Sequence, residues 1–552
     1  MRVSSTFGRL SDVLIPISFL LQSASAATIE EWKTRTVYQT MTDRFARTDG
    51  STTSPCNATA GLYCGGTWQG TIDKLDYIQN MGFDAIMISP IIENIDGRVS
   101  YGEAYHGYWP LDLYALNSHF GTKQDLLDLS KEVHDRGMYL MMDTVINNMA
   151  YITNGSNPAT TIDYSVFTPF NSAEYFHPYC TLTDWNNYTI AQLCNTGDNI
   201  TALPDLFTEH EDVQNLLMDW TLDAMSNYSV DGLRIDAAKS VTPSFLRKYS
   251  DKIGAFMTGE VMDSSASTVC NYQTNYMGSL PNYPIYYSML KAFTQGMVSE
   301  LVDSVQTVKN LCPDVNAMVS FSENHDVDRF ATFTDDISLA KNVITFTLMF
   351  DGVPFIYQGQ EQHMKGSYAS MENRDAVWMT DYDPSAELVS VITTLNKIRK
   401  HAYRMDNSYV DSVSYNIYQG GSEMAFTKGS EGRQVIMLLS TQGTNSTPYT
   451  LNLPSSFNAG TNITEVLSCQ TYFVNEYDAS LTVNMDSGLP QVFFPTSLMP
   501  GSGICGYSSA NLTYTQVKTG QTGSTSAGSR NQQVLGHASL GAVFLALMTL
   551  AF

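Results

Sequence analysis

The chain has 552 residues, of which 43% are hydrophobic and 15% charged, a composition typical of folded globular proteins rather than disordered ones. This length accommodates one large domain together with smaller ones. The formal net charge of −25 argues against nucleic acid or anionic membranes as partners and suits a neutral ligand such as a polysaccharide.

The N-terminal segment, residues 1–26, has the features of a secretory signal peptide. Arg2 and Arg9 supply positive charge, residues 13–21 form an apolar stretch, and Ala24-Ser25-Ala26 is a small-residue cleavage site. A buried first helix is the alternative interpretation. Secretion predicts that the eight cysteines form disulfides, whose connectivity the sequence alone leaves open. They fall into sequential pairs: Cys56 with Cys64, Cys180 with Cys194, Cys270 with Cys312, and Cys469 with Cys505.

Asn-x-Ser/Thr sequons also fit a secreted glycoprotein, because such acceptors are expected on surface loops. No Cys-x-x-Cys spacing suggests zinc. The candidate glycosylation sites are Asn57, Asn154, Asn187, Asn199, Asn227, Asn445, Asn462 and Asn511.

Apolar runs bounded by turn signals recur along the first two thirds of the chain and predict strands. Between them, residues 122–137, 212–228 and 338–349 have the periodicity of helices. Repeated alternation of strand and helix predicts an α/β fold, a (β/α)8 TIM barrel. The predicted strands are 37–45, 85–89, 139–146, 232–236, 256–261, 318–325 and 353–360, with 284–287 as a candidate for the remaining strand.

Two regions depart from this alternation. Residues 148–206 are rich in Asn, Thr, Pro and Gly, which predicts an inserted loop domain after strand 3. The barrel is therefore assigned to residues 27–147 and 207–403. Residues 404–510 alternate between apolar and polar positions, with turns between the runs, which predicts a C-terminal antiparallel β-sandwich domain. Its predicted strands lie in SVSYNIY, MAFTKG, QVIMLLS, TYFVNEYD and GLPQVFFPT.

The C-terminal tail carries a second targeting pattern. Residues 511–528 are a Ser/Gly/Thr-rich linker, and residues 529–552 are a polar stretch followed by an apolar end. That apolar end is shorter than the roughly 20 residues of a membrane span. Small residues before it predict a GPI-anchor signal, with attachment at Ser526 and removal of residues 529–552. A plain tail anchor or a frayed helix are the alternatives. We therefore expect a secreted protein at the cell surface or in the cell wall, attached to the membrane only through a GPI anchor.

Polar residues close several of the predicted strands. In a TIM barrel the catalytic groups lie at the C-terminal ends of the strands. Carboxylates that converge there repel one another and lose hydration, so a purely structural cluster is disfavoured. Without a phosphate-cradling glycine loop, such a cluster indicates glycoside chemistry. The residues selected are Asp143, Asp236, Glu260 and His325-Asp326. The competing interpretation is a metal-binding cluster of the enolase-like kind, to which we would add His106, Asn147 and Asp205.

Four segments resemble the conserved regions of the α-amylase family, glycoside hydrolase family 13. They are DTVINN (143–148), GLRIDAAKS (232–240), GEV (259–261) and ENHD (323–326). Supporting stretches are GFDAIMISP (82–90), AYHGYW (104–109), LPDL (203–206) and DGVPFIYQGQEQH (351–363). Order and spacing agree from about residue 28 to 507. The resemblance is closest to the secreted fungal α-amylases and includes all four cysteine pairs.

The resemblance implies a retaining mechanism with a covalent intermediate. Asp236 would be the nucleophile, and Arg234, two residues earlier on the same strand face, would keep it ionised. Glu260 would be the general acid and then the base, which requires a pKa above that of Asp236. Their carboxyl groups should lie about 5–5.5 Å apart. Asp326, the third catalytic carboxylate, would bind two sugar hydroxyls and favour ring distortion.

The resemblance also implies a substrate-binding set around these carboxylates. His106 and His325 would hydrogen-bond hydroxyls of the sugar being cleaved, and Tyr108 would stack on it. Lys239 would contact the neighbouring sugar on the leaving-group side. Arg374 would hold the sugar one step further in on the other side. The remaining members of the expected set are Trp109 and Asn148.

A calcium site is implied as well. Its expected ligands are the side chains of Asn147 and Asp205 and the backbone carbonyls of Gln192 and Ser240. Hard oxygen ligands of this kind suit Ca²⁺. The ion would hold the inserted loop domain over the cleft. The alternative is that these residues only cap and turn the chain.

Three positions depart from the family pattern. Asn148 stands where a His usually hydrogen-bonds the 6-hydroxyl of the sugar being cleaved, and Asn is shorter and neutral. Losing one such bond costs about 1–1.5 kcal/mol, or roughly tenfold. Ser240 replaces another His, of which only the carbonyl is expected at calcium. Ser370 stands where the family has an Asp near the inner subsites.

These departures concern substrate handling and leave the three catalytic carboxylates in place. A glycosyl-enzyme partitions between water and a sugar hydroxyl, so altered subsites can favour transfer. The chain in this respect resembles GPI-anchored fungal 4-α-glucanotransferases of cell-wall α-glucan metabolism, and we favour that activity. The alternatives are a plain endo-acting α-amylase that hydrolyses starch and a non-catalytic glucan-binding wall protein. The expected partner is α-1,4-glucan, as starch, maltooligosaccharide or wall glucan, and a monomer is the default state.

Overall fold

The computed structural model describes residues 26–454 and 456–510. Residues 1–25 of the predicted signal peptide, Ser526, the sequon at Asn511, the linker and the predicted anchor signal lie outside the described residues. Every other sequon asparagine has an exposed side chain. None of the described helices combines the length and hydropathy needed to cross a membrane.

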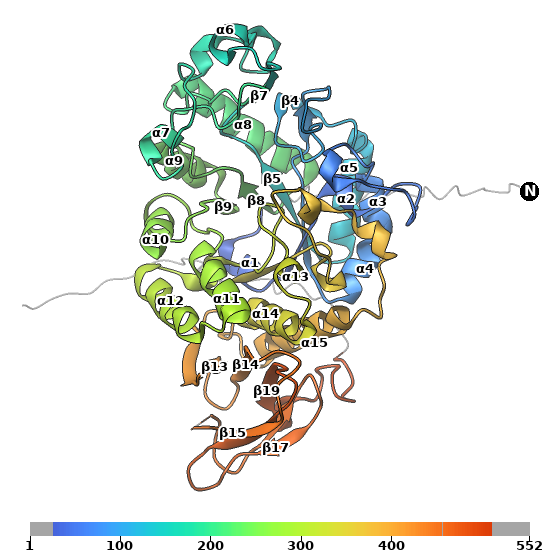
Figure 1. The fold of residues 1–552 in the computed structure, drawn as a ribbon, viewed down its shortest axis with the longest axis vertical. Helices are drawn as coiled ribbons and strands as arrows, with labels where there is room; N and C mark the ends of the chain where they lie inside the picture. The colour runs from blue at the N-terminus through green and yellow to red at the C-terminus, as the bar shows by residue number, and fades with distance from the viewer. Residues whose placement is uncertain (1–25, 455, 511–552) are drawn as a thin grey trace, which may run out of the picture. The chain divides into compact units, whose positions relative to one another are not determined.

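Seven parallel strands form the centre of the molecule and confirm the predicted barrel (Figure 1). Their order is β10-β11-β1-β2-β5-β8-β9. Isolated bridges from Ser279 to Thr258 and from Pro281 to Val319 fill the remaining gap between β9 and β10. The strands are β1 (Val37–Gln39), β2 (Ala85–Ile88), β5 (Tyr139–Thr144), β8 (Gly232–Ile235), β9 (Phe256–Gly259), β10 (Val319–Ser320) and β11 (Val353–Tyr357).

The prediction of a strand at residues 284–287 is wrong. These residues lie in helix α11 (Tyr283–Gln295), and the short stretch Ser279–Pro281 takes the strand position instead. Asn282 caps the helix by accepting a hydrogen bond from the Ile285 amide, and Pro284 occupies its first turn. Proline is favoured there because its fixed φ and missing N–H suit a helix start.

The first predicted strand, 37–45, is also too long. It ends at Gln39, and residues 42–45 form the short helix α2 (Thr42–Phe45). Both segments are buried, so the run of buried residues does not separate strand from helix. The C-terminal edge of the barrel at β1 is therefore marked by Gln39.

Helices surround the barrel. Helix α5 begins with a capping box in which the Thr122 and Asp125 side chains each accept from the other's backbone amide. The longer helices are α5 (Lys123–Asp135), α8 (Glu211–Tyr228), α9 (Pro243–Ile253), α10 (Ala266–Asn275), α11, α12 (Val298–Leu311), α14 (Ile337–Met349) and α15 (Glu387–Met405). The shorter ones include α1 (Ile29–Lys33), α3 (Trp68–Asp73), α4 (Leu75–Asn80) and α13 (Phe330–Phe333).

Between β5 and α8 the chain forms a long excursion with little regular structure. It contains β6 (Tyr151–Ile152), β7 (Thr201–Ala202), α6 (Pro158–Thr161) and α7 (Tyr188–Ala191). The pair β3 (Ile92–Asn94) and β4 (Pro110–Leu116) lies in a second, shorter excursion after β2. Residues of the two excursions share a small apolar cluster that includes Ile95, Trp109 and Ala150.

The C-terminal part forms a six-stranded antiparallel sheet, β12-β13-β14-β19-β16-β17, and a two-stranded sheet, β15-β18, around an apolar core. The sequence pattern missed three strands, β15, β16 and β18. The strands are β12 (Tyr415–Gln419), β13 (Glu423–Lys428), β14 (Val435–Ser440), β15 (Tyr449–Leu453), β16 (Asn462–Glu465), β17 (Thr471–Phe473), β18 (Leu481–Met485) and β19 (Gln491–Pro495).

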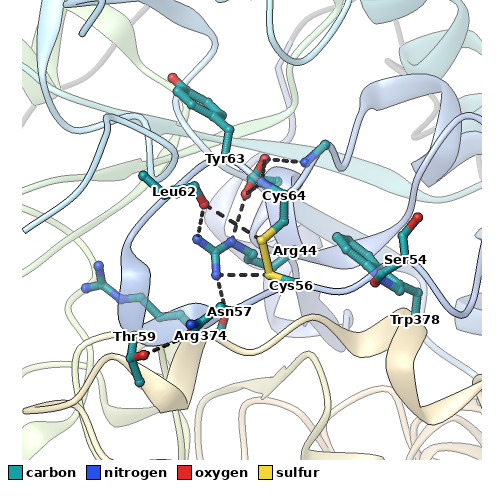
Figure 2. The surroundings of a disulfide bond; sticks show 12 residues. Arg44, Ser54, Cys56, Asn57, Thr59, Leu62, Tyr63, Cys64, Arg374 and Trp378 are labelled. Carbon is teal, nitrogen blue, oxygen red and sulfur yellow. Dashed lines mark hydrogen bonds and ion pairs between the residues drawn. A yellow bond between two sulfur atoms is a disulfide. The ribbon is translucent and has the colours of Figure 1, made fainter. Parts of the chain in front are cut away.

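Four disulfides join the eight cysteines in the sequential pairs noted above. Figure 2 shows the Cys56–Cys64 bond beside the fully buried Arg44. Arg44 pairs with Asp43 and donates to the carbonyl oxygens of Leu62 and Arg374. This disulfide loop is thereby tied to the segment that carries Arg374.

Candidate active site

Four strand ends bring their acidic side chains to one buried arginine. Arg234 Nη1 lies 3.0 Å from Asp143 Oδ1 and 2.7 Å from Asp236 Oδ1. Arg234 Nη2 lies 2.9 Å from Glu260 Oε2 and 3.7 Å from Asp326 Oδ2. The structure therefore assembles all the carboxylates that the strand-end rule selected. One guanidinium holds the whole cluster at the C-terminal mouth of the barrel.

The environment of these carboxylates separates their proton affinities. Burial raises the pKa of Glu260 to about 7, although Arg234 opposes the shift. Burial also raises the pKa of Asp236 to about 6, against the same arginine. Burial alone would raise the pKa of Asp326, but His325, Arg374 and Arg234 outweigh it and lower the pKa. Between pH 6 and 7 the cluster thus favours a protonated Glu260 beside an ionised Asp236.

Local backbone geometry aims Glu260 into the site. The Ala237 amide donates to Glu260 Oε2 at 3.1 Å, and Ala237 has a φ of 45°. A positive φ is unusual for a residue with a Cβ and costs roughly 1–3 kcal/mol. The Lys239 amide donates to the Glu260 carbonyl at 3.1 Å, so the turn after β8 supports the end of β9. This strained turn fixes the direction of the Glu260 carboxyl group.

A wall of neutral rings faces the carboxylates. The Tyr108 hydroxyl donates to Asp143 Oδ2 at 2.6 Å and lies 2.8 Å from His325 Nε2. Burial lowers the pKa of His325 to about 3 and that of His106 well below its usual range. His106 Nδ1 accepts from the Tyr108 amide, which leaves its Nε2–H as a donor. Both imidazoles are therefore neutral, and His106 keeps a hydrogen-bond donor for a ligand.

Three contributors to the site escaped the sequence analysis: Gln39, Arg44 and Tyr105. Gln39 Nε2 lies 2.9 Å from His325 Nδ1 and sets its tautomer. Arg374 Nη2 lies 2.9 Å from Asp326 Oδ1. Arg44 donates to the backbone carbonyl of Arg374, and the Tyr105 hydroxyl lies 3.4 Å from Arg374 Nη1. The strand-end rule would have selected Gln39 if the end of β1 had been placed correctly.

The two flanks of the cluster differ in chemistry. On the Glu260 side, Lys239 Nζ lies 3.8 Å from Asp263 Oδ2. On another side, the rings of Trp109 and His106 make an edge contact with centroids 4.9 Å apart. Trp109 also lines a hollow of about 710 Å³ together with Tyr101, Tyr179, Leu182, Trp185 and Leu203. Aromatic faces of this kind suit the apolar faces of sugar rings.

The three residues that depart from the family pattern make hydrogen bonds within the protein. Asn148 is buried, and its Nδ2 donates to the Met149 carbonyl at 3.2 Å. Ser240 is buried, and its backbone amide donates to the carbonyl of Ala237. The Ser370 hydroxyl donates to Glu372 Oε2 at 2.9 Å. Asn148 therefore uses one of its two amide N–H donors on the protein's own backbone.

The expected calcium ligands are buried oxygen donors. Asn147 Nδ2 lies 3.1 Å from Asp205 Oδ1, and His177 Nδ1 lies 2.7 Å from Asp205 Oδ2. Turning the Asn147 amide would present its oxygen instead. The segments of Asp205 and Ser240 are linked through a bond from Thr208 to Thr242. Within residues 26–454 and 456–510 no three His, Cys, Asp or Glu side chains are arranged to hold a metal. One carboxylate with amide and carbonyl oxygens is a donor set that fits Ca²⁺ and disfavours transition metals.

Comparisons with known proteins agree on one family. The family model described as "Alpha amylase, catalytic domain" matches residues 39–390, and "Alpha-amylase, domain C" matches residues 416–513. Alpha-amylase 2 of Schwanniomyces occidentalis is 42% identical over 494 residues, which cover 89% of this chain and 96% of that protein. Alpha-amylase mde5 of Schizosaccharomyces pombe is 36% identical over 521 residues, which cover 92% and 95%. A solved α-amylase structure from Malbranchea cinnamomea matches with a TM-score of 0.83 at 41% identity, covering 87% of this chain and 100% of that one.

Proposed function

This chain belongs to the α-amylase family, and from that premise we propose that it cleaves α-1,4-glucan with retention, through a glycosyl-enzyme on Asp236. The observation that carries the proposal is the shared guanidinium of Arg234, which binds Asp236 and Glu260 through different nitrogens. Two carboxylates on one guanidinium are compatible with the separation of about 5–5.5 Å that retaining glycosidases use. An inverting enzyme needs more room for a water molecule between them.

In the first step, Asp236 attacks the anomeric carbon as the glycosidic bond breaks, and Glu260 gives its proton to the departing oxygen. The order of pKa values, about 6 for Asp236 and about 7 for Glu260, supplies both protonation states in one pH range. The product is a glycosyl ester on Asp236 and a free 4-hydroxyl on the leaving chain. Asp326 stays ionised because its pKa is lowered, so it can bind two sugar hydroxyls.

In the second step, Glu260 takes a proton from the incoming hydroxyl, which attacks the anomeric carbon and releases the Asp236 carboxylate. Repulsion from Asp236 is one cause of the raised pKa of Glu260. Esterification removes that negative charge, so the pKa of Glu260 falls when it must act as a base. The same pair of residues thus serves both steps.

The neutral rings bind the sugar without competing for the proton. His106 offers its Nε2–H to a sugar hydroxyl. Tyr108, His325 and Asp143 are joined by hydrogen bonds and together orient the sugar ring. Arg374 fixes Asp326 and lies toward the next sugar on the donor side. Lys239 lies on the leaving-group side, next to the loop that follows Glu260.

Calcium is part of this proposal. Asn147 and Asp205, with the carbonyls of Gln192 and Ser240, would hold it, and the ion would supply structural cross-linking rather than chemistry at the anomeric carbon. His177 keeps the Asp205 carboxylate oriented through its bond to Oδ2. The expected consequence is a firmer attachment of the segment 148–206 to the barrel.

We further propose that the second step favours a sugar hydroxyl over water, which makes the protein a 4-α-glucanotransferase. The supporting observation is Asn148, which is shorter than the usual histidine and gives one of its two amide N–H groups to the Met149 carbonyl, so it would hold the donor-side sugar less tightly. The predicted anchor would place this activity on wall α-glucan at the cell surface. Plain starch hydrolysis is the second candidate, because the relatives compared above are named as α-amylases. A non-catalytic role is disfavoured by the complete set of carboxylates.

Incubation of the purified protein with maltoheptaose, followed by separation of products by size, tests the proposal. Transfer predicts products longer than the substrate, with few new reducing ends. Only shorter products, with reducing ends rising in step with cleavage, would show a hydrolase instead. The Asp236→Asn variant serves as the blank, because without the nucleophile neither reaction proceeds. A wild-type protein that matches this blank would contradict the enzymatic assignment altogether.

A further inference from the structure

Helix α7 of the inserted segment carries a tyrosine that contacts the loop beyond the acid/base. The Tyr188 hydroxyl donates to Asp263 Oδ2 at 2.6 Å. Lys239 Nζ lies 4.8 Å from the centre of the Tyr188 ring and 3.8 Å from the same Asp263 oxygen. The phenol, the ammonium group and the carboxylate therefore form a closed triangle. Each group in it interacts with both of the others.

This triangle lies on the leaving-group side of the catalytic pair. Asp263 follows Glu260 by three residues on the same loop. Lys239 donates through its amide to the Glu260 carbonyl and through Nζ to the Met262 carbonyl at 3.5 Å. Because Glu260 must reach the oxygen of the departing or incoming sugar, that sugar lies next to these groups.

The contacts with Tyr188 and Asp263 restrict the conformation of the long, flexible Lys239 side chain. The side chains of Lys239 and Asp263 are only 10% and 16% exposed, so their charges are poorly screened. The Tyr188 ring offers its negative face to the ammonium group, and its hydroxyl holds the Asp263 carboxylate in place. Burial and the bond to Asp263 raise the pKa of Tyr188, so the phenol remains a donor.

We propose that Tyr188 is a positioning residue for the acceptor sugar, acting by orienting Lys239 and Asp263 toward it. This inference rests on the proposed reaction and adds the residue from the inserted segment that controls its acceptor side. An acceptor hydroxyl group enters a site whose cation and carboxylate are already placed. The cost of ordering Lys239 is thereby met before the sugar binds.

The helix does not depend on this hydroxyl for its attachment. Gln192, which ends α7, lies with its Nε2 3.4 Å from the Tyr272 hydroxyl, and Tyr272 also approaches the Lys239 carbonyl at 3.4 Å. The rings of Tyr188 and Tyr272 lie 6.2 Å apart in a tilted contact. The Tyr188→Phe variant keeps these packing contacts and removes the hydroxyl group, with its bond to Asp263 and its hydrogen bond with Thr268.

The test compares two reactions of the full chain. α-Maltosyl fluoride has a leaving group that needs neither a sugar site nor a proton, so fluoride release reports on the donor side. Transfer of its maltosyl group to added maltose reports on the acceptor side. For Tyr188→Phe we expect the half-saturating maltose concentration to rise about five- to tenfold, the effect of one ordinary hydrogen bond, because Tyr188 acts on the sugar only through Lys239 and Asp263. Fluoride release should stay within about twofold of wild type, because the donor side loses no hydrogen bond.

The matched control is Tyr449→Phe, which removes a tyrosine bond to a carboxylate, Glu423 Oε1 at 2.5 Å, in the C-terminal sheet. It should change neither reaction. A double-mutant cycle with Lys239→Met tests whether Tyr188 acts through Lys239. If it does, Tyr188→Phe should have little further effect in the Lys239→Met background. Equal losses in both reactions, full additivity, or an unchanged maltose dependence would each overturn the assignment.

The role of Tyr188 can still be tested if the protein has no transfer activity. If the wild type forms no transfer product, the acceptor side is measured through the KM for maltopentaose hydrolysis, whose leaving chain occupies the same site. Tyr188→Phe should then raise that KM about five- to tenfold while fluoride release is retained. An unchanged KM would overturn the role of Tyr188, whichever acceptor the enzyme uses.

Discussion

Arg234 binds Asp236 through a 2.7 Å contact in which both side chains are largely removed from water. Arginine can hold several carboxylates at once because its guanidinium is a planar fork, whereas lysine is a point charge. For Arg234→Lys we expect kcat to fall at least about 100-fold, the usual cost of losing one preorganised electrostatic contact. Arg234 also opposes the raised pKa of Asp236, so its loss should move the acidic limb of the kcat/KM profile to higher pH.

The measurement is the pH profile for maltoheptaose cleavage, with thermal melting to confirm folding. The matched control is Arg247→Lys, at an exposed pair with Asp251 on α9. Exposed pairs of this kind contribute little, so the control should resemble wild type. An Arg234→Lys enzyme with wild-type kcat would contradict the role given to this arginine.

The catalytic pair predicts a bell-shaped dependence of kcat/KM on pH. Activity needs Asp236 ionised, so it should fall below pH about 6, and it needs Glu260 protonated, so it should fall above pH about 7. With α-maltosyl fluoride no proton is donated to the leaving group, so the alkaline limb of the glycosylation step should disappear. If the alkaline limb remains with α-maltosyl fluoride, it reports the titration of a group other than Glu260.

Asn148 provides a prediction about partitioning. Asn148→His restores a side chain that can reach the 6-hydroxyl of the donor sugar, worth roughly tenfold in kcat/KM for one hydrogen bond. We also expect the ratio of transfer to hydrolysis to fall, because the change removes the feature on which the transfer proposal rests. Product sizes and reducing ends from maltoheptaose measure both effects. Asn148→Gln is the control, and a transfer ratio unchanged by the histidine would contradict the link.

The sequence was sufficient to predict that the carboxylates of the candidate site converge, because they follow the strands of the barrel. Asp236, Glu260 and Asp326 close strands or the runs that follow them, and parallel strands end at one edge. Gln39 follows the same rule but was missed, because the predicted strand runs over residues 37–45 and only the structure shows the strand ending at Gln39. A short buried run cannot distinguish strand from helix by periodicity alone.

Contacts between distant segments were beyond prediction for a different reason. Residues 284–287 follow the sequence pattern of a strand, but the Asn282 cap and Pro284 start a helix there. The contact of Tyr188 with Asp263 joins segments 75 residues apart, and nothing in either local sequence records it. Of the three strands missed in the C-terminal sheets, β15 and β18 do alternate in burial and could have been found from their apolar and polar positions. Strand β16 does not alternate, because only Asn462 in it is exposed.

Calcium removal gives a stability prediction. If Asp205 and Asn147 hold the ion, adding a calcium chelator should lower Tm, and adding Ca²⁺ back should restore it. Ligand at about 1,000 times its Kd contributes roughly 4 kcal/mol to stability. Asp205→Asn should abolish the response to Ca²⁺, while Asp198→Asn, in the same inserted segment but hydrogen-bonded to Tyr101, should retain it. A wild-type Tm that ignores both chelator and Ca²⁺ would remove calcium from the proposal.

The last prediction concerns the junction of the barrel with the C-terminal sheets. Lys428 on β13 lies 2.6 Å from Asp351 Oδ1, and both side chains are at most 3% exposed. Lys428 also donates to Asn316 Oδ1, and Asp351 accepts from Ser414.

Lys428→Met leaves a buried carboxylate without its cation, which should lower the free energy of unfolding by about 3–5 kcal/mol. Urea unfolding measures this loss, and Lys291→Met, at the exposed pair with Glu300, is the control with an expected change below about 1 kcal/mol. Because a well-packed apolar pair can replace a buried ion pair at little cost, Lys428→Met with Asp351→Leu should recover much of the stability. A double variant no more stable than Lys428→Met would show that Asp351 matters for its bonds to Ser414 rather than for the lysine.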